Sequence, residues 1–291
     1  MRYAYQLRSH ANARYQDSLI SLSQKELACM LSACGVDAQI TPCTLGGAPF
    51  LCFEADPLTP AQAAFVHGHS ALYMTAALEG DLLRPLDPPA IPCLPGDMPD
   101  ILKYKGKTNA AFTHLLINLA LSAGGVWQQP HPRVLDPICG RGTTLFVGAN
   151  RGWQCTGTDI DKADLKEAET FFKRYLEYHR FKHALERESF TLKGKKSAPG
   201  AAFTFADTPE HFRQKQTASL KLTNCDATEA REAFGSRAFH LIACDLPYGV
   251  QHASQGGSLE KLLARALPGW RGMLKPGGTV AVSFNAQTLK P

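Results

Sequence analysis

Two short segments of the chain combine glycine, aspartate and aromatic residues in patterns typical of a ligand-binding or catalytic site. Residues 134–144 read VLDPICGRGTT, and residues 244–249 read CDLPYG. In the first segment a strand-like run enters a turn with Gly140 and Gly142, and a helix is expected directly after it. A turn without side chains lets a ligand approach the backbone, and the amides of the following helix face that ligand. In the second segment a buried strand ends on Asp245, a proline and an aromatic residue, which together can hold a flat amine-bearing group by hydrogen bonding and stacking.

The elements around these segments predict where the site lies. From about residue 101, the strand-like runs RVLD, CTGTD, LKLTN, HLIACD and TVAVSF alternate with helical stretches. This alternation predicts a parallel sheet covered by helices on both faces, and ligands of such sheets bind outside the carboxyl ends of the strands. Acidic residues lie at or just past those ends, namely Asp136, Asp159, Asp226 and Asp245. We therefore expect a single site at this edge.

Both segments resemble class I S-adenosylmethionine-dependent amino-methyltransferases. In that family the cofactor turn reads D-P-x-C-G-x-G-T and the catalytic tetrapeptide reads Asp/Asn-P-P-Tyr/Phe. The tetrapeptide here is Asp245-Leu246-Pro247-Tyr248, with leucine at the first proline position. The resemblance implies that the Asp245 side chain and the Leu246 carbonyl accept hydrogen bonds from the target amine, while Tyr248 stacks on the base and holds it in line. The alternative is a buried aspartate that caps a loop beside a tyrosine that fills the core.

The resemblance also implies S-adenosylmethionine as the cofactor. Asp136 would meet its ammonium, Asp159 its ribose hydroxyls and Asp226 its adenine amine. The expected cofactor-binding residues are Asp136, Pro137, Cys139, Gly140, Gly142, Thr143, Asp159, Ile160, Asp226 and Ala227. Taken singly, Asp226 is more often a helix cap, and Cys139 is interpreted as a packing residue and not as a nucleophile. A nicotinamide cofactor would need G-x-G-x-x-G tight against the strand, and only two glycines occur.

The chain is expected to form two domains. Residues 1–80 predict a small α+β domain, which resembles the ferredoxin-like subdomain of the THUMP-associated guanosine-N2 tRNA methyltransferases. Six prolines between positions 85 and 99 predict an extended linker over 81–100. Residues 101–291 then form the Rossmann-like methyltransferase domain. The closing C-terminal hairpin of that family is expected to be missing, and no room is left for a THUMP module.

Three local patterns refine this division. Ser23 with Glu26, and Thr59 with Gln62, each match the capping box that opens a helix. The segment KYKGKTN (103–109) resembles the one that closes over the methionine end of the cofactor in the family. Its three lysines could instead form a solvated face.

A basic insertion points towards the substrate. Residues 179–221 contain nine Lys or Arg against four Asp or Glu. Lys193, Lys195 and Lys196, with Phe190, Phe203 and Phe205 nearby, fit an arm that follows phosphates and stacks on bases. With the resemblance, this favours RNA as partner and guanine N2 in tRNA as target. The alternatives are a DNA adenine or cytosine-N4 methyltransferase, a protein glutamine methyltransferase, or a non-catalytic RNA-binding protein.

Composition sets wider bounds. The 291 residues carry a formal charge of +5, and nine cysteines are scattered without a C-x-x-C pair, which indicates free thiols and no metal site. No apolar run reaches the ~20 residues that a membrane span needs, and the N-terminus lacks the apolar stretch of a signal peptide. We expect a cytoplasmic protein without a membrane partner.

Overall fold

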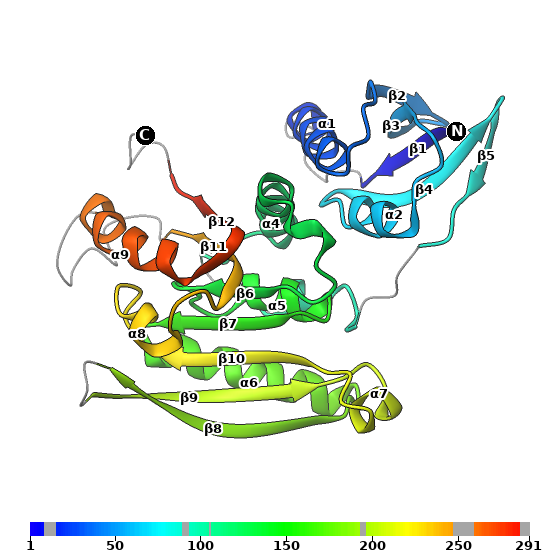
Figure 1. Cartoon of the computed structure of the whole chain (residues 1–291). Coiled ribbons are helices and arrows are strands. Elements are labelled where there is room, and N and C mark those ends of the chain that lie inside the picture. The colour runs from blue at the N-terminus through cyan, green and yellow to red at the C-terminus, as the bar shows by residue number, and fades with distance from the viewer. Residues whose placement is uncertain (9–15, 89–92, 105, 193–195, 247–258, 286–291) are drawn as a thin grey trace. The chain divides into compact units, whose positions relative to one another are not determined.

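The chain folds into two compact units in the computed structural model (Figure 1). The first unit contains Met1–Ile91 and Ile117–Gln128, and the second contains Pro92–Leu116 and Gln129–Pro291. The structure describes all residues except 9–15, 89–92, 105, 193–195, 247–258 and 286–291. Pro247, Tyr248, Lys193 and Lys195 therefore lie outside the described residues.

The first unit is built on a five-stranded antiparallel sheet. Its strands are β1 (Arg2–Leu7), β2 (Thr41–Leu45), β3 (Ala48–Glu54), β4 (Leu72–Glu79) and β5 (Leu82–Pro85). They lie in the order β2-β3-β1-β4-β5, and each neighbouring pair is antiparallel. Helix α1 (Gln16–Ala33) connects β1 to β2, and helix α2 (Pro60–His67) connects β3 to β4.

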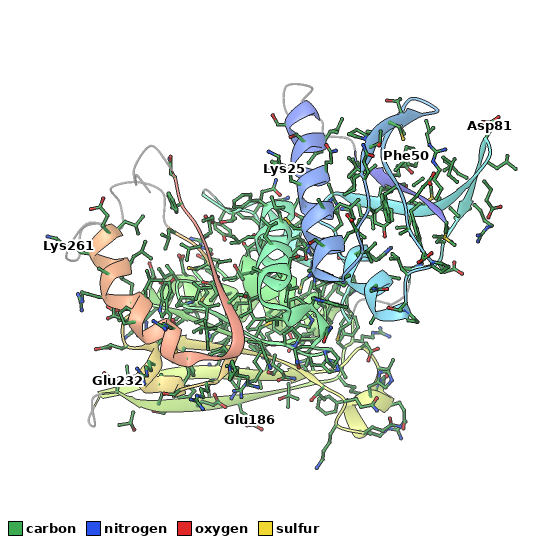
Figure 2. All side chains as sticks on the ribbon, turned by 45° about the horizontal axis from the view of Figure 1, so that its top comes forward. Lys25, Phe50, Asp81, Glu186, Glu232 and Lys261 are labelled. Carbon is green, nitrogen blue, oxygen red and sulfur yellow. The ribbon has the colours of Figure 1, made fainter. Side chains whose placement is uncertain are left out.

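Strand β5 lies where the sequence predicted the start of a linker. Asp81 stands at the tip of the hairpin that joins β4 to β5 (Figure 2), and Leu82 begins the new strand. The prolines of this region did not prevent pairing, because Pro85 is the last residue of an edge strand, where a missing N–H is tolerated. Residues 117–128 likewise belong to the first unit, although the sequence placed them in the second domain.

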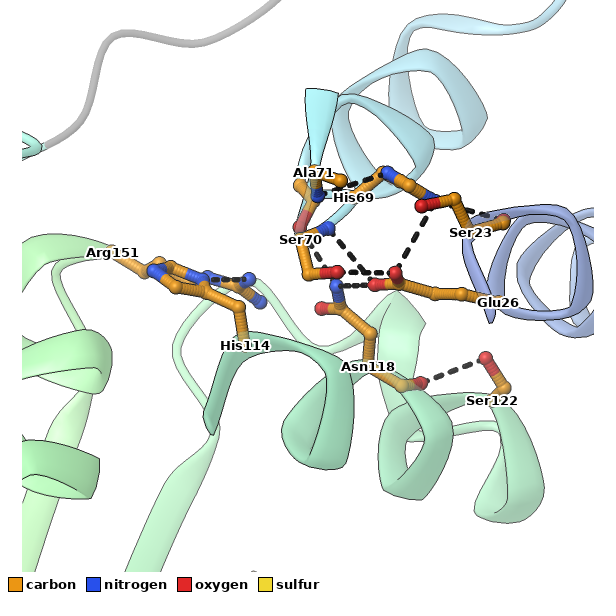
Figure 3. A network of polar contacts seen from close by, with 10 residues as sticks. Ser23, Glu26, His69, Ser70, Ala71, His114, Asn118, Ser122 and Arg151 are labelled. Atoms are coloured by element: carbon orange, nitrogen blue, oxygen red, sulfur yellow. Dashed lines mark hydrogen bonds and ion pairs between the residues drawn. The ribbon is translucent and has the colours of Figure 1, made fainter. Parts of the chain in front are cut away.

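The two predicted capping boxes had different outcomes. The box at Thr59 is confirmed, since the Thr59 hydroxyl accepts from the Gln62 amide and the Gln62 side chain accepts from the Thr59 amide. The box at Ser23 is wrong, because helix α1 begins upstream at Gln16 and both Ser23 and Glu26 lie within it. The Glu26 carboxylate instead enters a buried polar network (Figure 3).

The second unit contains a mixed seven-stranded sheet. Its strands are β6 (Arg133–Asp136), β7 (Gln154–Asp159), β8 (His183–Leu192), β9 (Lys196–Phe205), β10 (Ala218–Asn224), β11 (Phe239–Asp245) and β12 (Leu274–Ser283). They lie in the order β12-β11-β6-β7-β10-β9-β8; the strands from β12 to β10 are parallel to their neighbours, whereas β9 and β8 are antiparallel. The helices are α3 (Met98–Ile101), α4 (Ala110–Gly124), α5 (Thr143–Asn150), α6 (Lys162–Tyr178), α7 (Pro209–Arg213), α8 (Ala230–Phe234) and α9 (Leu259–Met273). Helix α4 is divided between the two units at residues 116 and 117.

Helices cover both faces of this sheet, as the sequence predicted. Leu135 of β6 pairs with Ile242 of β11, and both belong to the core cluster that contains Trp270 of α9. The next residue of β6, Asp136, pairs with Gly157 of β7. A Cβ added at Gly157 would lie 2.4 Å from the Leu145 side chain of α5. Because successive residues of a strand face opposite sides, α9 and α5 cover opposite faces.

The basic insertion forms the antiparallel pair β8–β9, which extends the sheet beyond β10. Phe203 and Phe205 are fully buried and pack edge-on against Phe172 of α6. Phe190 packs against Phe234 of α8. The expectation that these three rings stack on bases is therefore wrong, and the sheet is mixed instead of wholly parallel. The rings are apolar core that attaches the insertion to the sheet.

Candidate functional site

The site lies where the order of the parallel strands reverses. From β6 the chain continues to β7 and β10 on one side, and then crosses to β11 and β12 on the other. Crevices at such a reversal, outside the carboxyl ends of the strands, are where open α/β sheets bind ligands. Asp136 ends β6 and Asp245 ends β11, so both stand at this point. Asp159 ends the neighbouring strand β7, and Asp226 follows the end of β10 by two residues.

A glycine turn follows β6 and leads into α5. Gly140 has φ of +50° and Gly142 has φ of +89°, both in the left-handed region that favours glycine. The Gly142 amide donates to the Cys139 carbonyl at 2.8 Å and closes the turn. Gly142 then caps α5 without a side-chain acceptor, and Thr143 is its first residue. The amides of this first turn can therefore meet a polar group of a ligand.

Asp159 holds the glycine turn in place. Its carboxylate accepts from the Gly140 amide at 2.7 Å and from the Asp161 amide at 2.9 Å. Cys139 packs beneath the turn, and a Cβ added at Gly157 would lie 2.8 Å from its sulfur, so β7 and the turn approach closely. Burial is the main cause that raises the pKa of the Cys139 thiol well above its usual value. Both observations favour a packing role for Cys139.

Asp136 is a buried acid among other acids. Burial is the main cause that raises its pKa to about 7, and the negative charges of Asp159 and Asp245 raise it further. Hydrogen bonds from the Thr144 hydroxyl and the Ile138 amide act in the opposite direction. Burial is also the main cause of a raised pKa at Asp159. Within the part of the chain that the structure describes, neither Asp136 nor Asp159 forms an ion pair with Lys or Arg. A cationic ligand would stabilise the charged form of both.

The Asp245 side chain is held by two hydroxyl groups. Thr108 Oγ1 donates to Asp245 Oδ2 at 2.6 Å, and Ser283 Oγ donates to Asp245 Oδ1. Leu246 is buried, and its amide donates to the Ser283 carbonyl at 2.9 Å. Sequence reasoning named neither Thr108 nor Ser283. The rule that found the acids at strand ends would have found Ser283, which is the last residue of β12, had it been applied to hydroxyl groups.

The remaining predicted cofactor residues lie around the same edge. Asp226 accepts from both the amide and the hydroxyl of Thr228, so it shapes a turn before α8. Ala227 is buried next to it, and Pro137 is buried in the turn after β6. Ile160 directly follows β7 and is 54% exposed. A large apolar side chain exposed at a strand end is available for contact with a flat ring.

Segment 103–109 contacts the glycine turn through Tyr104. The hydroxyls of Tyr104 and Thr143 lie 3.4 Å apart, and the Arg141 guanidinium stands 4.7 Å from the centre of the Tyr104 ring. Arg141 is also paired with Asp164 and Glu167 of α6, both at 2.8 Å. The turn, α6 and the segment before α4 are thereby joined. The composition of the segment did not predict these contacts.

No group of three or more His, Cys, Asp or Glu suited to a metal ion occurs among the described residues. Across the same residues, no helix is long and apolar enough to cross a membrane.

Distant similarities to solved structures accompany this geometry. No protein-family profile and no curated protein matches the sequence. The rRNA methyltransferase aviRa from Streptomyces viridochromogenes is similar at 16% identity, with 65% of this chain and 79% of that chain covered and a TM-score of 0.38. A second similar structure is the Thermus thermophilus 16S rRNA N2 G1207 methyltransferase RsmC in complex with AdoMet and guanosine. Its identity is 14%, the match covers 93% of this chain and 64% of that chain, and the TM-score is 0.37. The N-terminal domain of human METTL16 in complex with SAH is similar at 12% identity. The match covers 91% of this chain and 80% of that chain, with a TM-score of 0.35. Similarity at these TM-scores does not assign a function, which must be inferred from the residues of this chain.

Proposed function

We propose that this chain transfers a methyl group from S-adenosylmethionine to an exocyclic amine of a nucleic-acid base. The observation that carries the proposal is the edge of the second sheet where the strand order reverses. There a left-handed glycine turn opens α5, and Asp136, Asp159 and Asp245 end three adjacent parallel strands. The sequences of the two segments that contribute most of these residues resemble the amino-methyltransferase motifs, with Leu246 at the first proline position of the second motif.

The residues at this edge fit S-adenosylmethionine. Asp136 is a buried carboxyl group without a described basic partner, and the ligand carries both an ammonium and a sulfonium. Asp159 lies at the end of β7 and can accept from the ribose hydroxyls. Asp226 can accept from the adenine amine, while Ile160 offers an exposed apolar contact for the ring. The amides at the start of α5, from Thr143 on, can meet the polar groups of the methionine portion.

When bound, the cofactor would supply an electrophilic methyl group on a sulfonium: the N–C bond would form as the S–C bond breaks, S-adenosylhomocysteine would leave, and the amine proton would pass to water. Asp245 accepts a hydrogen bond from the target amine, and the Leu246 carbonyl accepts a second. These two acceptors draw the nitrogen towards a pyramidal geometry and aim its lone pair at the methyl group. Tyr248, which lies outside the described residues, would stack on the base.

The substrate class in this proposal is RNA, with guanine N2 in tRNA as the preferred target. The βαββαβ connection of the first unit, with β2-β3-β1-β4 as neighbours, supports a ferredoxin-like domain before the methyltransferase domain. The basic residues of 179–221 support a polyanionic partner, with Lys193, Lys195 and Lys196 as phosphate contacts. A cytoplasmic location belongs to the same proposal.

The test is incubation of the protein with methyl-labelled S-adenosylmethionine and, separately, total RNA, total DNA and total protein. Label in RNA, recovered as N2-methylguanosine after digestion, is the expected result, with Asp245→Ala as the inactive control. Label in the DNA or the protein fraction would replace the substrate with one of the two alternative enzyme classes. Cofactor binding without transfer to any fraction would indicate a non-catalytic RNA-binding protein.

A further inference from the structure

The Asp245 carboxylate is held from two sides by residues far away in the sequence. Thr108 precedes α4 and donates to one carboxylate oxygen at 2.6 Å, across 137 positions of the chain. Ser283 ends β12 and donates to the other oxygen. Each oxygen therefore receives one hydroxyl hydrogen bond, and the two donors come from different elements.

Two such donors restrict the rotation of the carboxylate. The terminal torsion of an aspartate is broad when nothing fixes it. A hydroxyl donor on each oxygen removes most of that freedom. Thr108 and Ser283 thus select one plane for the Asp245 carboxylate.

Asp136 lies near the restrained carboxylate. The carboxyl groups of Asp136 and Asp245 interact electrostatically, and after burial Asp245 is one of the causes that raise the pKa of Asp136. Hydrogen bonds from Thr108 and Ser283 hold Asp245 beside this second acid.

Ser283 also acts on the second acceptor of the proposed reaction. Its backbone carbonyl accepts from the Leu246 amide at 2.9 Å, so one residue of β12 holds both the Asp245 side chain and the backbone that carries the Leu246 carbonyl. Tyr104, four positions before Thr108, lies close to Thr143 at the start of α5, with the two hydroxyls 3.4 Å apart.

We propose that Thr108 and Ser283 are positioning residues, which hold the Asp245 carboxylate in the orientation that receives the target amine. This inference rests on the proposed function. It predicts that loss of either hydroxyl slows transfer without weakening cofactor binding.

The experiment compares Thr108→Val and Ser283→Ala with the wild-type protein at saturating S-adenosylmethionine and RNA. Each variant should lose about ten-fold or more in kcat, the usual effect of deleting a partner that orients a reacting group, while the cofactor Kd stays within a few-fold. Thr108→Ser keeps the hydroxyl and should restore most of the rate. Matched controls are Thr113→Val, whose hydroxyl donates to the Asn109 carbonyl, and Ser219→Ala, whose hydroxyl donates to Gln154. Both should keep the wild-type rate.

A double-mutant cycle separates positioning from a general loss of structure. In the Asp245→Ala background, Thr108→Val should produce no further loss, because its effect passes through the carboxylate that is already gone. A Thr108→Val protein with wild-type kcat, beside an impaired Asp245→Ala protein, overturns the positioning role and leaves the proposed function standing. Equal losses in Thr108→Val and Thr108→Ser, or additive losses in the double variant, also overturn it. A wild-type protein that labels no RNA, DNA or protein overturns both.

Discussion

Asp136 is a buried acid, and burial raises its pKa to about 7. A bound ammonium would lower that pKa, so cofactor binding should release a proton when the free protein holds one. Affinity for S-adenosylmethionine should then rise from about pH 6 to about pH 7.5 and fall at higher pH, where the α-amino group of the ligand, with a pKa of about 8, loses its charge. Calorimetry in two buffers of different ionisation enthalpy measures the released proton directly. Asp136→Asn should lack the rise on the acid side, and a wild-type protein that also lacks this rise would remove Asp136 from the cofactor site.

Asp159 ends β7 and Asp245 ends β11 at the same edge of the sheet. Replacing each of them should impair a different property of the protein. Asp159→Ala removes an expected ribose partner and also frees the Gly140 amide, so cofactor binding should weaken by about 1–3 kcal/mol. Asp245→Ala should keep cofactor affinity within a few-fold and lose about a hundred-fold in turnover. Calorimetry and single-turnover assays on both variants distinguish the two effects. Identical losses of affinity in the two variants would contradict the division of roles.

The sequence predicted the strand-end acids because each of them follows directly on its own apolar run. Asp136 and Asp159 are identified by residues within a few positions of them, and the parallel arrangement then brings them to one edge. Thr108 and Ser283 could not be found in that way, since their partner Asp245 is distant in the chain. Glu26 shows the opposite error, in which a local capping pattern was overridden by burial against distant partners.

Among the elements, the turn between β6 and α5 depends most on its glycines. Gly142→Ala would impose a left-handed conformation on a Cβ and place that atom 3.2 Å from the Phe146 ring, which itself stacks on Phe172. Gly35, just after the end of α1, is a matched control, since it has φ of +72° and nothing within 4 Å of an added Cβ. Both variants should lose about 1–2 kcal/mol to backbone strain. Gly142→Ala should lose more, because the ring must also move.

The same pair of variants tests where the cofactor lies. Gly142→Ala should weaken cofactor affinity as well as stability, whereas Gly35→Ala should leave that affinity unchanged. Chemical denaturation and calorimetry give the two quantities separately. If the two variants lose equal stability and bind the cofactor equally well, the turn is not a ligand site.

The elements that the sequence missed were concealed by their composition. Strands β8 and β9 are rich in charged and small residues, with Pro199 and Gly200 inside β9, so their weak alternation resembled a solvated arm. Their apolar positions become meaningful only beside α6, where Phe172 meets Phe203 and Phe205. Strand propensity of this kind depends on the neighbours that a strand packs against, which a single sequence does not display.

At the scale of the whole molecule, the two units are not consecutive stretches of chain. Residues 117–128 return to the first unit after the second has begun. Trp127 donates to the Ala33 carbonyl at 2.9 Å and stacks on Phe65, with the ring centres 5.6 Å apart. The segment that follows α4 therefore packs into the first unit, and a cut at residue 100 would remove it.

The polar network of Figure 3 is the other attachment of this returning segment. Glu26 is 1% exposed, and its carboxylate accepts from the Ser70 amide at 2.9 Å, from the Ser70 hydroxyl at 2.5 Å and from the Asn118 amide group at 2.7 Å. The His69 ring accepts from the Ala71 amide through Nδ1, so Nε2 carries the hydrogen and lies 3.2 Å from Glu26. The Ser70 amide, the Ser70 hydroxyl and the Asn118 amide group all donate to Glu26, whereas the Nε2 hydrogen of His69 also faces the Ser23 carbonyl at 3.0 Å.

An acceptor surrounded by donors cannot be exchanged for an amide without cost. Glu26→Gln keeps the size of the side chain but turns an NH2 group towards a donor such as Ser70 or Asn118, so the free energy of unfolding should fall by about 1–3 kcal/mol. Glu54→Gln is the matched control, because Glu54 is exposed at the end of β3 and should change little. Chemical denaturation measures both variants. Cofactor affinity should be unchanged in each, since every residue assigned to the site belongs to the second unit. Unaltered stability in Glu26→Gln would mean that the network tolerates a donor in place of the carboxylate, and that the returning segment is held by its apolar contacts alone.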